Sequence, residues 1–347
     1  MPDAPPPVRA DRLAWPDAAR GLSVTLIVIL HMWASHLIFW IGNHSVMGFI
    51  EQLVDWTSPL RIPLFFFVSG YLASRSLQKP WRAAWRGRVF AISYLYVLWV
   101  ALIAAFIWVD NTANGFDAES PLGMVLRNVG SPETHMWYLW ALVVLFIAVW
   151  LTRRVPAWIV VSVGAVISIA APFFLDQPYR QVAAAALFFS LGARLPVVTE
   201  WLTSRRGTWI FLAGSAAYVG SVLLGPTGPY GLADPLTSTV GVAAMVAIIS
   251  TVAHQRWMAV FRRIGRNTLP IFILNPLVFL LLNDLLRSLP NVSDWLARHT
   301  EVGALYSIAV ILATFGISLG LKAAADRIGM RWLFSMPARW FSAPVRS

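Results

Sequence analysis

The sequence has 347 residues, of which 58% are hydrophobic and only 12% are charged. Soluble domains are usually about 45–50% apolar and about 25% charged, so this composition excludes an ordinary soluble protein. The 27 basic residues outnumber the 16 acidic ones and give a formal charge of +11. On so apolar a chain, this charge favours loops beside anionic lipid and excludes a nucleic-acid partner. The absence of cysteine excludes disulfides, thiolate metal sites and cysteine nucleophiles.

Ten segments are apolar over roughly the 20 residues that a helix needs to cross a bilayer. We therefore predict an all-α, polytopic transmembrane helix bundle with about ten transmembrane helices. The expected spans are residues 20–41, 58–73, 89–109, 136–151, 156–174, 181–195, 208–224, 236–254, 269–286 and 302–321. Several of them are short or end in polar residues, which is typical of helices that line a cavity.

The distribution of basic residues predicts the orientation of these spans. Only five of the 27 fall in segments expected to be external, and these are Arg61, Arg127, Arg180, Arg287 and Arg298. The positive-inside rule then places both termini in the cytoplasm. Residues 1–16, with five prolines, predict a disordered cytoplasmic lead-in. Residues 17–323 form the expected transmembrane domain, and residues 324–347 a basic cytoplasmic tail.

His31 is an ionisable residue near the middle of the first expected span. It follows Arg20 by eleven residues, about 16 Å along a helix at 1.5 Å per residue. Eleven steps of about 100° return to nearly the same helix face, and Asp17 shares that face. An ionisable group at this depth is costly and indicates a functional role. The alternative is a structural histidine that hydrogen-bonds a neighbouring helix.

The second expected span begins with Arg61, one of the few external cations. Arg61 stands where an anion or a carbonyl oxygen can be held, and the alternative is an interface arginine that snorkels to the membrane surface. Farther along the same segment, Ser69 and Gly70 permit the close approach of another backbone or of a ligand.

Before the third expected span, Arg82 and Arg86 lie one helical turn apart, with Arg88 and Lys79 nearby. Such a pair matches the geometry with which guanidinium groups bind phosphate or pyrophosphate. The alternative is ordinary positive charge beside anionic lipid.

Four polar or aromatic residues precede or begin the fourth expected span. Glu133, His135, Trp137 and Tyr138 are expected at its external mouth, with His135 interpreted as an interfacial histidine rather than a catalytic one. No spacing of histidine and carboxylate resembles a metal site, so no metal is expected.

Asn275 precedes Pro276 in the ninth expected span. This places an amide beside a helix break at membrane depth, as in a residue that lines a cavity. His36 and His44 are expected on the external surface.

Taken together, these residues resemble an integral-membrane acyltransferase family, acyltransferase type 3. The similar elements are WPDAARG at 15–21 followed by His31, RIPLFFFVSGY at 61–71, the Arg82–Arg86 pair, WYL at 137–139, LFFSLGA at 187–193 and NTLPIFILNP at 267–276. They follow the order of the family over residues 15–276. The chain departs from the family at Asn275, where many members have a histidine.

The resemblance implies an enzyme, an O-acetyltransferase. Its members usually move acetyl from cytoplasmic acetyl-CoA to a hydroxyl of an extracytoplasmic sugar, polysaccharide or glycolipid. His31 would then be the general base or a transient acyl carrier, with Asp17 and Arg20 fixing its helix. Arg82, Arg86 and Arg88 would hold the phosphates of the acyl-CoA. The expected acceptor-binding residues are Arg61, Ser69, Glu133, Trp137 and Asn275. The expected location is the cytoplasmic (inner) membrane of a bacterium, and the oligomeric state, including a homodimer, is left open.

Two other functions fit the same composition. One is a proton-coupled transporter or flippase for a sugar or a lipid-linked intermediate, driven by protonation of His31. Such a protein should carry carboxylates deep within its helices, and Asp284 is the nearest to that description. The other is a structural scaffold in the cell envelope.

Overall fold

The computed structural model describes residues 13–41, 45–113, 115, 117, 119–204, 207–224, 235–299 and 302–337. These residues form helices joined by turns and loops, and no strand occurs among them, in agreement with the predicted all-α class. In chain order the helices are α1 (Ala14–Met32), the π-helix η1 (Trp33–Leu37), α2 (Ile38–Trp40), α3 (Ser45–Leu77), α4 (Trp81–Ala84), the π-helix η2 (Trp85–Phe90), α5 (Ala91–Ala113), α6 (Pro121–Gly130), α7 (Trp137–Leu151), α8 (Ala157–Phe174), α9 (Tyr179–Ala184), α10 (Ala186–Arg194), α11 (Pro196–Leu202), α12 (Gly207–Leu224), α13 (Pro235–Val252), η3 (Arg256–Met258), α14 (Ala259–Arg266), α15 (Thr268–Ser288), α16 (Pro290–Arg298), α17 (Gly303–Arg327) and η5 (Arg331–Leu333).

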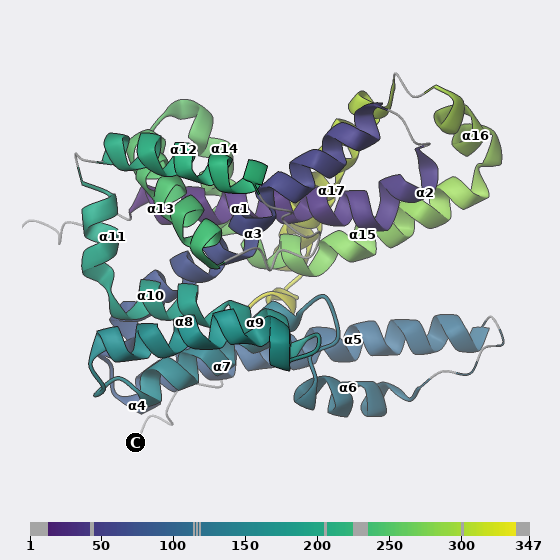
Figure 1. Ribbon diagram of the computed structural model, residues 1–347. Helices are drawn as coiled ribbons and strands as arrows, with labels where there is room; N and C mark the ends of the chain where they lie inside the picture. The colour runs from purple at the N-terminus through teal and green to yellow at the C-terminus, as the bar shows by residue number, and fades with distance from the viewer. Residues whose placement is uncertain are drawn as a thin grey trace, which may run out of the picture.

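The helices form two groups that meet at α3 and α10. Helices α1, α3 and α12 to α17 lie in one group, and α4 to α9 lie in the other (Figure 1). Helix α1 packs against α3, α13, α14 and α15, whereas α10 packs against α3 and α8. This arrangement places α1, α3, α7 and α15 around the region where the candidate site lies.

The predicted number of spans is not confirmed, although each of the ten expected segments lies on helical residues. Within the described ranges, six helical stretches are long and apolar enough to cross a membrane, or seven when a bent pair at 179–202 is counted. Helix α7 has only 15 residues, and α3 is long but contains charged residues and two prolines. The structure therefore supports a multi-pass membrane protein, while the count of ten and the sides of the termini stay predictions.

Two helix pairs approach so closely that only glycine fits between them. At the α1–α14 contact, a Cβ on Gly21 or Gly265 would collide with a backbone carbonyl oxygen of the opposite helix. At the α3–α10 contact, Gly70 and Gly192 are placed in the same way, as the sequence predicted for Gly70. Small residues of this kind let membrane helices pack by direct backbone contact.

Replacement of Gly265 by alanine tests this packing. The added methyl group has no space beside the Asp17 carbonyl, and overpacking of this kind costs about 1–3 kcal/mol. We expect a melting temperature several degrees lower for the detergent-solubilised Gly265→Ala variant. Gly316→Ala is the matched control, because a Cβ at Gly316 on α17 meets nothing within 4 Å. Equal melting temperatures for the two variants would contradict the close contact.

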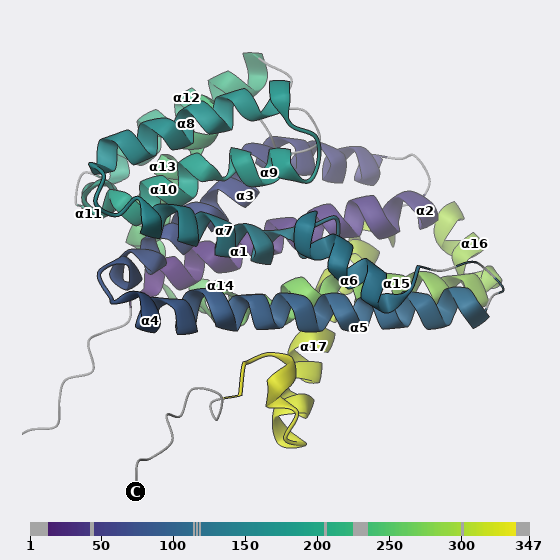
Figure 2. The same ribbon diagram turned by 90° about the horizontal axis from the view of Figure 1, so that it is seen from below.

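Both ends of the expected transmembrane domain need correction. Helix α1 begins at Ala14 and buries Trp15, so the predicted disordered lead-in is wrong for residues 14–16, while residues 1–12 lie outside the described part. At the other end α17 continues to Arg327, and the segment after it lies next to α5 (Figure 2). Trp99 donates a hydrogen bond of 2.7 Å to the Leu333 carbonyl, so the beginning of the predicted tail is part of the folded domain.

Candidate active site

Two cavities lie on either side of a cluster of aromatic rings. The larger has a volume of about 580 Å³ and is lined by residues of α1, η1, α2, α3, α7, α9 and α15 and by the turn before α7. The smaller has a volume of about 180 Å³ and is lined by residues of α1, α3, η2, α5, α7, α10 and α15. The polar residues predicted from the sequence are divided between them.

His31 lines the larger cavity together with Arg61 and His135. His31 lies deep in the protein but is partly accessible, because it faces this cavity. Helix α1 changes to the π-helix η1 two residues after His31, and such π-helical turns occur frequently at functional sites. The structure thus places His31 and Arg61 at the same cavity.

Arg61 is buried, with a relative exposure of 2%, so it is not an interface arginine that snorkels to the surface. Its Nη1 donates a hydrogen bond of 2.5 Å to the Val54 carbonyl, two turns earlier in α3. The guanidinium group is therefore held against its own helix and also lines the cavity.

His135 is not the interfacial histidine expected from the sequence. It lines the larger cavity with His31, and its Nε2 is buried without a hydrogen-bond partner among the described residues. Burial lowers the pKa of His135, which lies in the turn before α7, to about 4. The imidazole is therefore neutral at physiological pH and can accept a proton or donate a hydrogen bond. Trp137, two residues later, also lines this cavity and stacks on Phe66.

The smaller cavity contains two arginines at fixed positions. The Arg20 Nη2 donates a hydrogen bond of 2.6 Å to the Thr268 hydroxyl. The Arg88 Nη2 donates one of 2.5 Å to the Leu72 carbonyl, and its Nε one of 3.3 Å to the Ser76 hydroxyl. Arg88 belongs to the π-helix η2, whose wider turn changes the face on which each side chain lies. Ser69 lines this cavity and not the one that contains Arg61.

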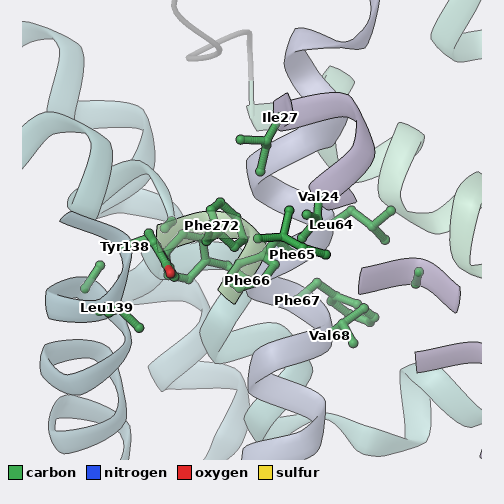
Figure 3. Close-up of a cluster of buried hydrophobic side chains, with 14 of the residues drawn as sticks. Val24, Ile27, Leu64, Phe65, Phe66, Phe67, Val68, Tyr138, Leu139 and Phe272 are labelled. Atoms are coloured by element: carbon green, nitrogen blue, oxygen red, sulfur yellow. The ribbon is translucent and has the colours of Figure 1, made fainter. Parts of the chain in front are cut away.

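Three aromatic residues, Phe65, Tyr138 and Phe272, line both cavities. Their ring centroids lie 6.0 Å apart for Phe65 and Tyr138, 5.3 Å for Phe65 and Phe272, and 4.2 Å for Tyr138 and Phe272. Figure 3 shows the three side chains directed toward one another from α3, α7 and α15. They form a wall between the cavities, which we call the aromatic wall.

Comparison with known proteins decides the family. A family profile described as an acyltransferase domain, Acyl_transf_3, matches residues 13–323. The chain belongs to this acyltransferase family. It is also 26% identical over 153 residues to the inner membrane protein YcfT of Escherichia coli strain K12, an alignment that covers 38% of this chain and 42% of that protein. The chain thus spans less than half of the length of this relative. No solved structure gives a significant match.

Several residues that the sequence predicted for the site line neither cavity. Arg82 and Arg86 are exposed on α4 and η2. The Glu133 carboxylate is exposed and lies 3.5 Å from the Arg127 Nε. Asp17 is buried in the first turn of α1, where its carbonyl oxygen meets Gly265 of α14.

Asn275 is buried in α15 and stabilises the helix at Pro276. Its Nδ2 donates hydrogen bonds of 3.0 Å to the carbonyls of Ile271 and Phe272. The Phe272 carbonyl would accept from residue 276 in a regular helix, but proline has no N–H. Asn275 therefore supplies the missing donor, and it does not line either cavity.

His36 is buried rather than on the external surface. Its Nδ1 and Nε2 lie 2.6 Å from the Asn283 Oδ1 and 2.5 Å from the Tyr306 hydroxyl. These hydrogen bonds join η1 to α15 and α17, so His36 has the structural role that the sequence left open for His31. His44 lies outside the described residues.

No group of three metal-ligating side chains occurs in the part of the chain that the structure describes.

Proposed function

We propose that this protein is a membrane-bound O-acyltransferase that moves an acyl group, acetyl in the simplest case, from acyl-CoA to a hydroxyl of an extracytoplasmic sugar, polysaccharide or glycolipid. One observation carries this proposal: two cavities of different chemistry, one with two arginines and one with His31, Arg61 and His135, meet at a single aromatic wall. In the orientation predicted from the basic residues, the arginine cavity lies toward the cytoplasm and the His31 cavity away from it.

The smaller cavity suits the acyl end of the donor. Small-molecule sites usually measure about 300–1,000 Å³, and 180 Å³ is too small for a whole coenzyme A. The thioester end can enter beside Arg20 and Arg88, whereas the phosphates stay outside. Arg82 and Arg86 are exposed in the same chain segment as Arg88, where guanidinium groups can bind phosphate.

The larger cavity suits the acceptor. Its volume of 580 Å³ is within the usual range for a small-molecule site. It combines aromatic and aliphatic walls with a few polar groups, namely His31, Arg61, His135, Glu51 and Gln181. Trp137 offers an aromatic surface of the kind on which a sugar ring can stack, and the polar groups can bind its hydroxyls.

In the proposed mechanism, neutral His31 removes the proton from the acceptor hydroxyl as general base. The oxygen forms a bond to the thioester carbonyl carbon, the carbon–sulfur bond breaks, and the proton passes from His31 to the leaving thiolate to give free coenzyme A. In the second route a His31 ring nitrogen bonds to the thioester carbonyl carbon, the carbon–sulfur bond breaks, and coenzyme A leaves as the thiol with the proton lost from the imidazole. The acyl group then passes to the acceptor oxygen, and the proton of the acceptor hydroxyl returns to His31. Arg61 stabilises the negative charge that develops on the carbonyl oxygen or binds the acceptor.

A thiol assay tests the proposal directly. The protein has no cysteine, so a thiol reagent detects only coenzyme A released from acyl-CoA. We expect purified protein in liposomes to release coenzyme A when acetyl-CoA and an envelope glycan or glycolipid fraction are both present. Isotopic acetate should appear in the glycan at the same time. The transporter alternative, which the family does not favour, predicts exchange of labelled solute across the liposome membrane without acetyl-CoA.

The double variant Arg82→Ala/Arg86→Ala tests whether these two arginines bind the phosphates of the donor. Loss of two exposed guanidinium groups should raise the KM for acetyl-CoA about tenfold. The KM for acetyl-pantetheine, which lacks the nucleotide, should not change. Arg153→Ala/Arg154→Ala is the matched control, because this pair is also exposed and basic. An equal effect on both donors would assign Arg82 and Arg86 to lipid contact instead.

A further inference from the structure

The aromatic wall contains one polar atom that the proposed mechanism does not use, the Tyr138 hydroxyl. Tyr138 has a relative exposure of 5%, and its hydroxyl oxygen is buried without a hydrogen-bond partner among the described residues. A buried hydroxyl without a partner is costly and calls for an explanation. Phe65 and Phe272, the other two residues of the wall, have no such group.

The position of the hydroxyl indicates what it can bind. Tyr138 lines both cavities, and Arg20 lines the smaller cavity with it. The Arg20 guanidinium carbon lies 5.9 Å from the centre of the Phe65 ring, so the arginine stands directly behind the wall. A group that entered the smaller cavity past Arg20 would therefore meet the Tyr138 hydroxyl before it reached the larger cavity.

We propose that the acyl group crosses between the cavities at the aromatic wall, and that Tyr138 is a catalytic residue whose hydroxyl donates a hydrogen bond to the acyl carbonyl oxygen. This inference rests on the proposed function and adds the route and a further residue to it. The three rings pack against one another in the structure, so this route requires one or more of them to turn aside when the acyl group enters.

The hydrogen bond fits the proton balance of the reaction. As the acceptor oxygen bonds to the carbonyl carbon, negative charge develops on the carbonyl oxygen, and the Tyr138 O–H can stabilise it. His31 carries the proton from the acceptor hydroxyl to the thiolate, so Tyr138 keeps its own proton throughout. The phenol therefore needs no base, in accord with its apolar surroundings of Phe65, Leu139 and Phe272.

The first experiment replaces the hydroxyl and keeps the ring. Removal of one donor to a developing oxyanion usually lowers kcat about 100-fold or more. We expect Tyr138→Phe to lower kcat for acetyl transfer by this factor with little change in the KM for acetyl-CoA. Tyr179→Phe is the matched control, because the Tyr179 hydroxyl bonds to the Gly130 carbonyl and Tyr179 lines neither of the two cavities. Unchanged kcat in Tyr138→Phe, with an active wild type, would overturn the role of Tyr138.

The second experiment tests the route without requiring acyl transfer. Because the chain has no cysteine, single cysteines can be introduced on each side of the wall, as Ser69→Cys in the smaller cavity and Ala34→Cys in the larger. A charged, membrane-impermeant thiol reagent is then applied to each face of sealed vesicles. With the wall intact, we expect each cysteine to react from one face, opposite for the two variants.

Opening the wall should remove this sidedness. We expect Ser69→Cys to react from both faces when Phe272→Ala is added, and to a lesser degree with Phe272→Leu, which serves if the alanine variant does not fold. Two results would overturn the route. One is that Ser69→Cys reacts from both faces while Phe272 is present, and the other is that it still reacts from one face only after Phe272→Ala is added. If wild-type protein releases no coenzyme A, the proposed function fails, but the labelling result still decides whether the wall separates the two sides.

Discussion

His31→Ala should abolish acyl transfer while the protein still inserts in the membrane. A positioned general base contributes about 10²–10⁴-fold to the rate, and His31 lines the larger cavity with Arg61 and His135. Release of coenzyme A from acetyl-CoA in the presence of acceptor is the measurement, and the elution profile in detergent checks the fold. His254→Ala is the matched control, because His254 is exposed in the turn after α13.

The same variant separates the two chemical routes. If His31 carries the acyl group, wild-type protein incubated with labelled acetyl-CoA and no acceptor should retain label after denaturation, and His31→Ala should not. If His31 acts only as a base, neither protein retains label. Full transfer activity in His31→Ala would remove this residue from both routes.

Arg61→Lys should lower kcat/KM for the acceptor by about 10- to 100-fold. The Arg61 guanidinium bonds to the Val54 carbonyl through Nη1, and its Nε has no partner among the residues described. Lysine keeps the positive charge. Its side chain has a single nitrogen, however, which cannot both bond to the Val54 carbonyl and face the cavity as the guanidinium group does. Arg61→Leu should be less active still and less stable, because the Val54 carbonyl loses this donor.

Arg287→Lys is the control for Arg61, since its side chain is 69% exposed and pairs with Asp284 on the surface. Such surface pairs contribute about 0–1 kcal/mol. Comparable losses of activity in the two variants would mean that Arg61 is not specifically required, and a loss of stability alone would assign it to helix α3 rather than to the site.

In the candidate site, the residues that could be predicted from the sequence are those whose ionisable side chains are costly to place in a membrane. His31 and Arg61 were identifiable because an imidazole and a guanidinium group stand within apolar segments, and the structure places both at the larger cavity. His135 and Tyr138 carried no such signal, because they lie at the boundary of the fourth expected span, where polar residues are common. Only the folded α6–α7 connection brings His135 to the cavity that His31 lines.

Other differences have local physical causes. Arg82 and Arg86 were paired on the assumption of a regular α-helix, whereas η2 is a π-helix and Arg88 is the residue that lines a cavity. Asn275 was expected at a cavity because it adjoins Pro276, but its amide compensates for the donor that proline lacks. Helix α3 contains charged residues, and the helices from α9 to α11 are bent. Hydropathy alone does not determine whether such segments cross the membrane, because tertiary packing also stabilises them.

Helix α1 contributes to both cavities, Arg20 to one and His31 to the other. Since α1 packs closely against α14 at Gly21, the separation between the two cavities is set by a helix and not by a loop. In the proposed mechanism, the specificities for the donor and for the acceptor are then structurally independent. If the larger cavity binds the acceptor as proposed, side chains of η1, α2 and the α6–α7 connection can change to fit a different acceptor without disturbing the Arg20–Thr268 hydrogen bond in the smaller cavity.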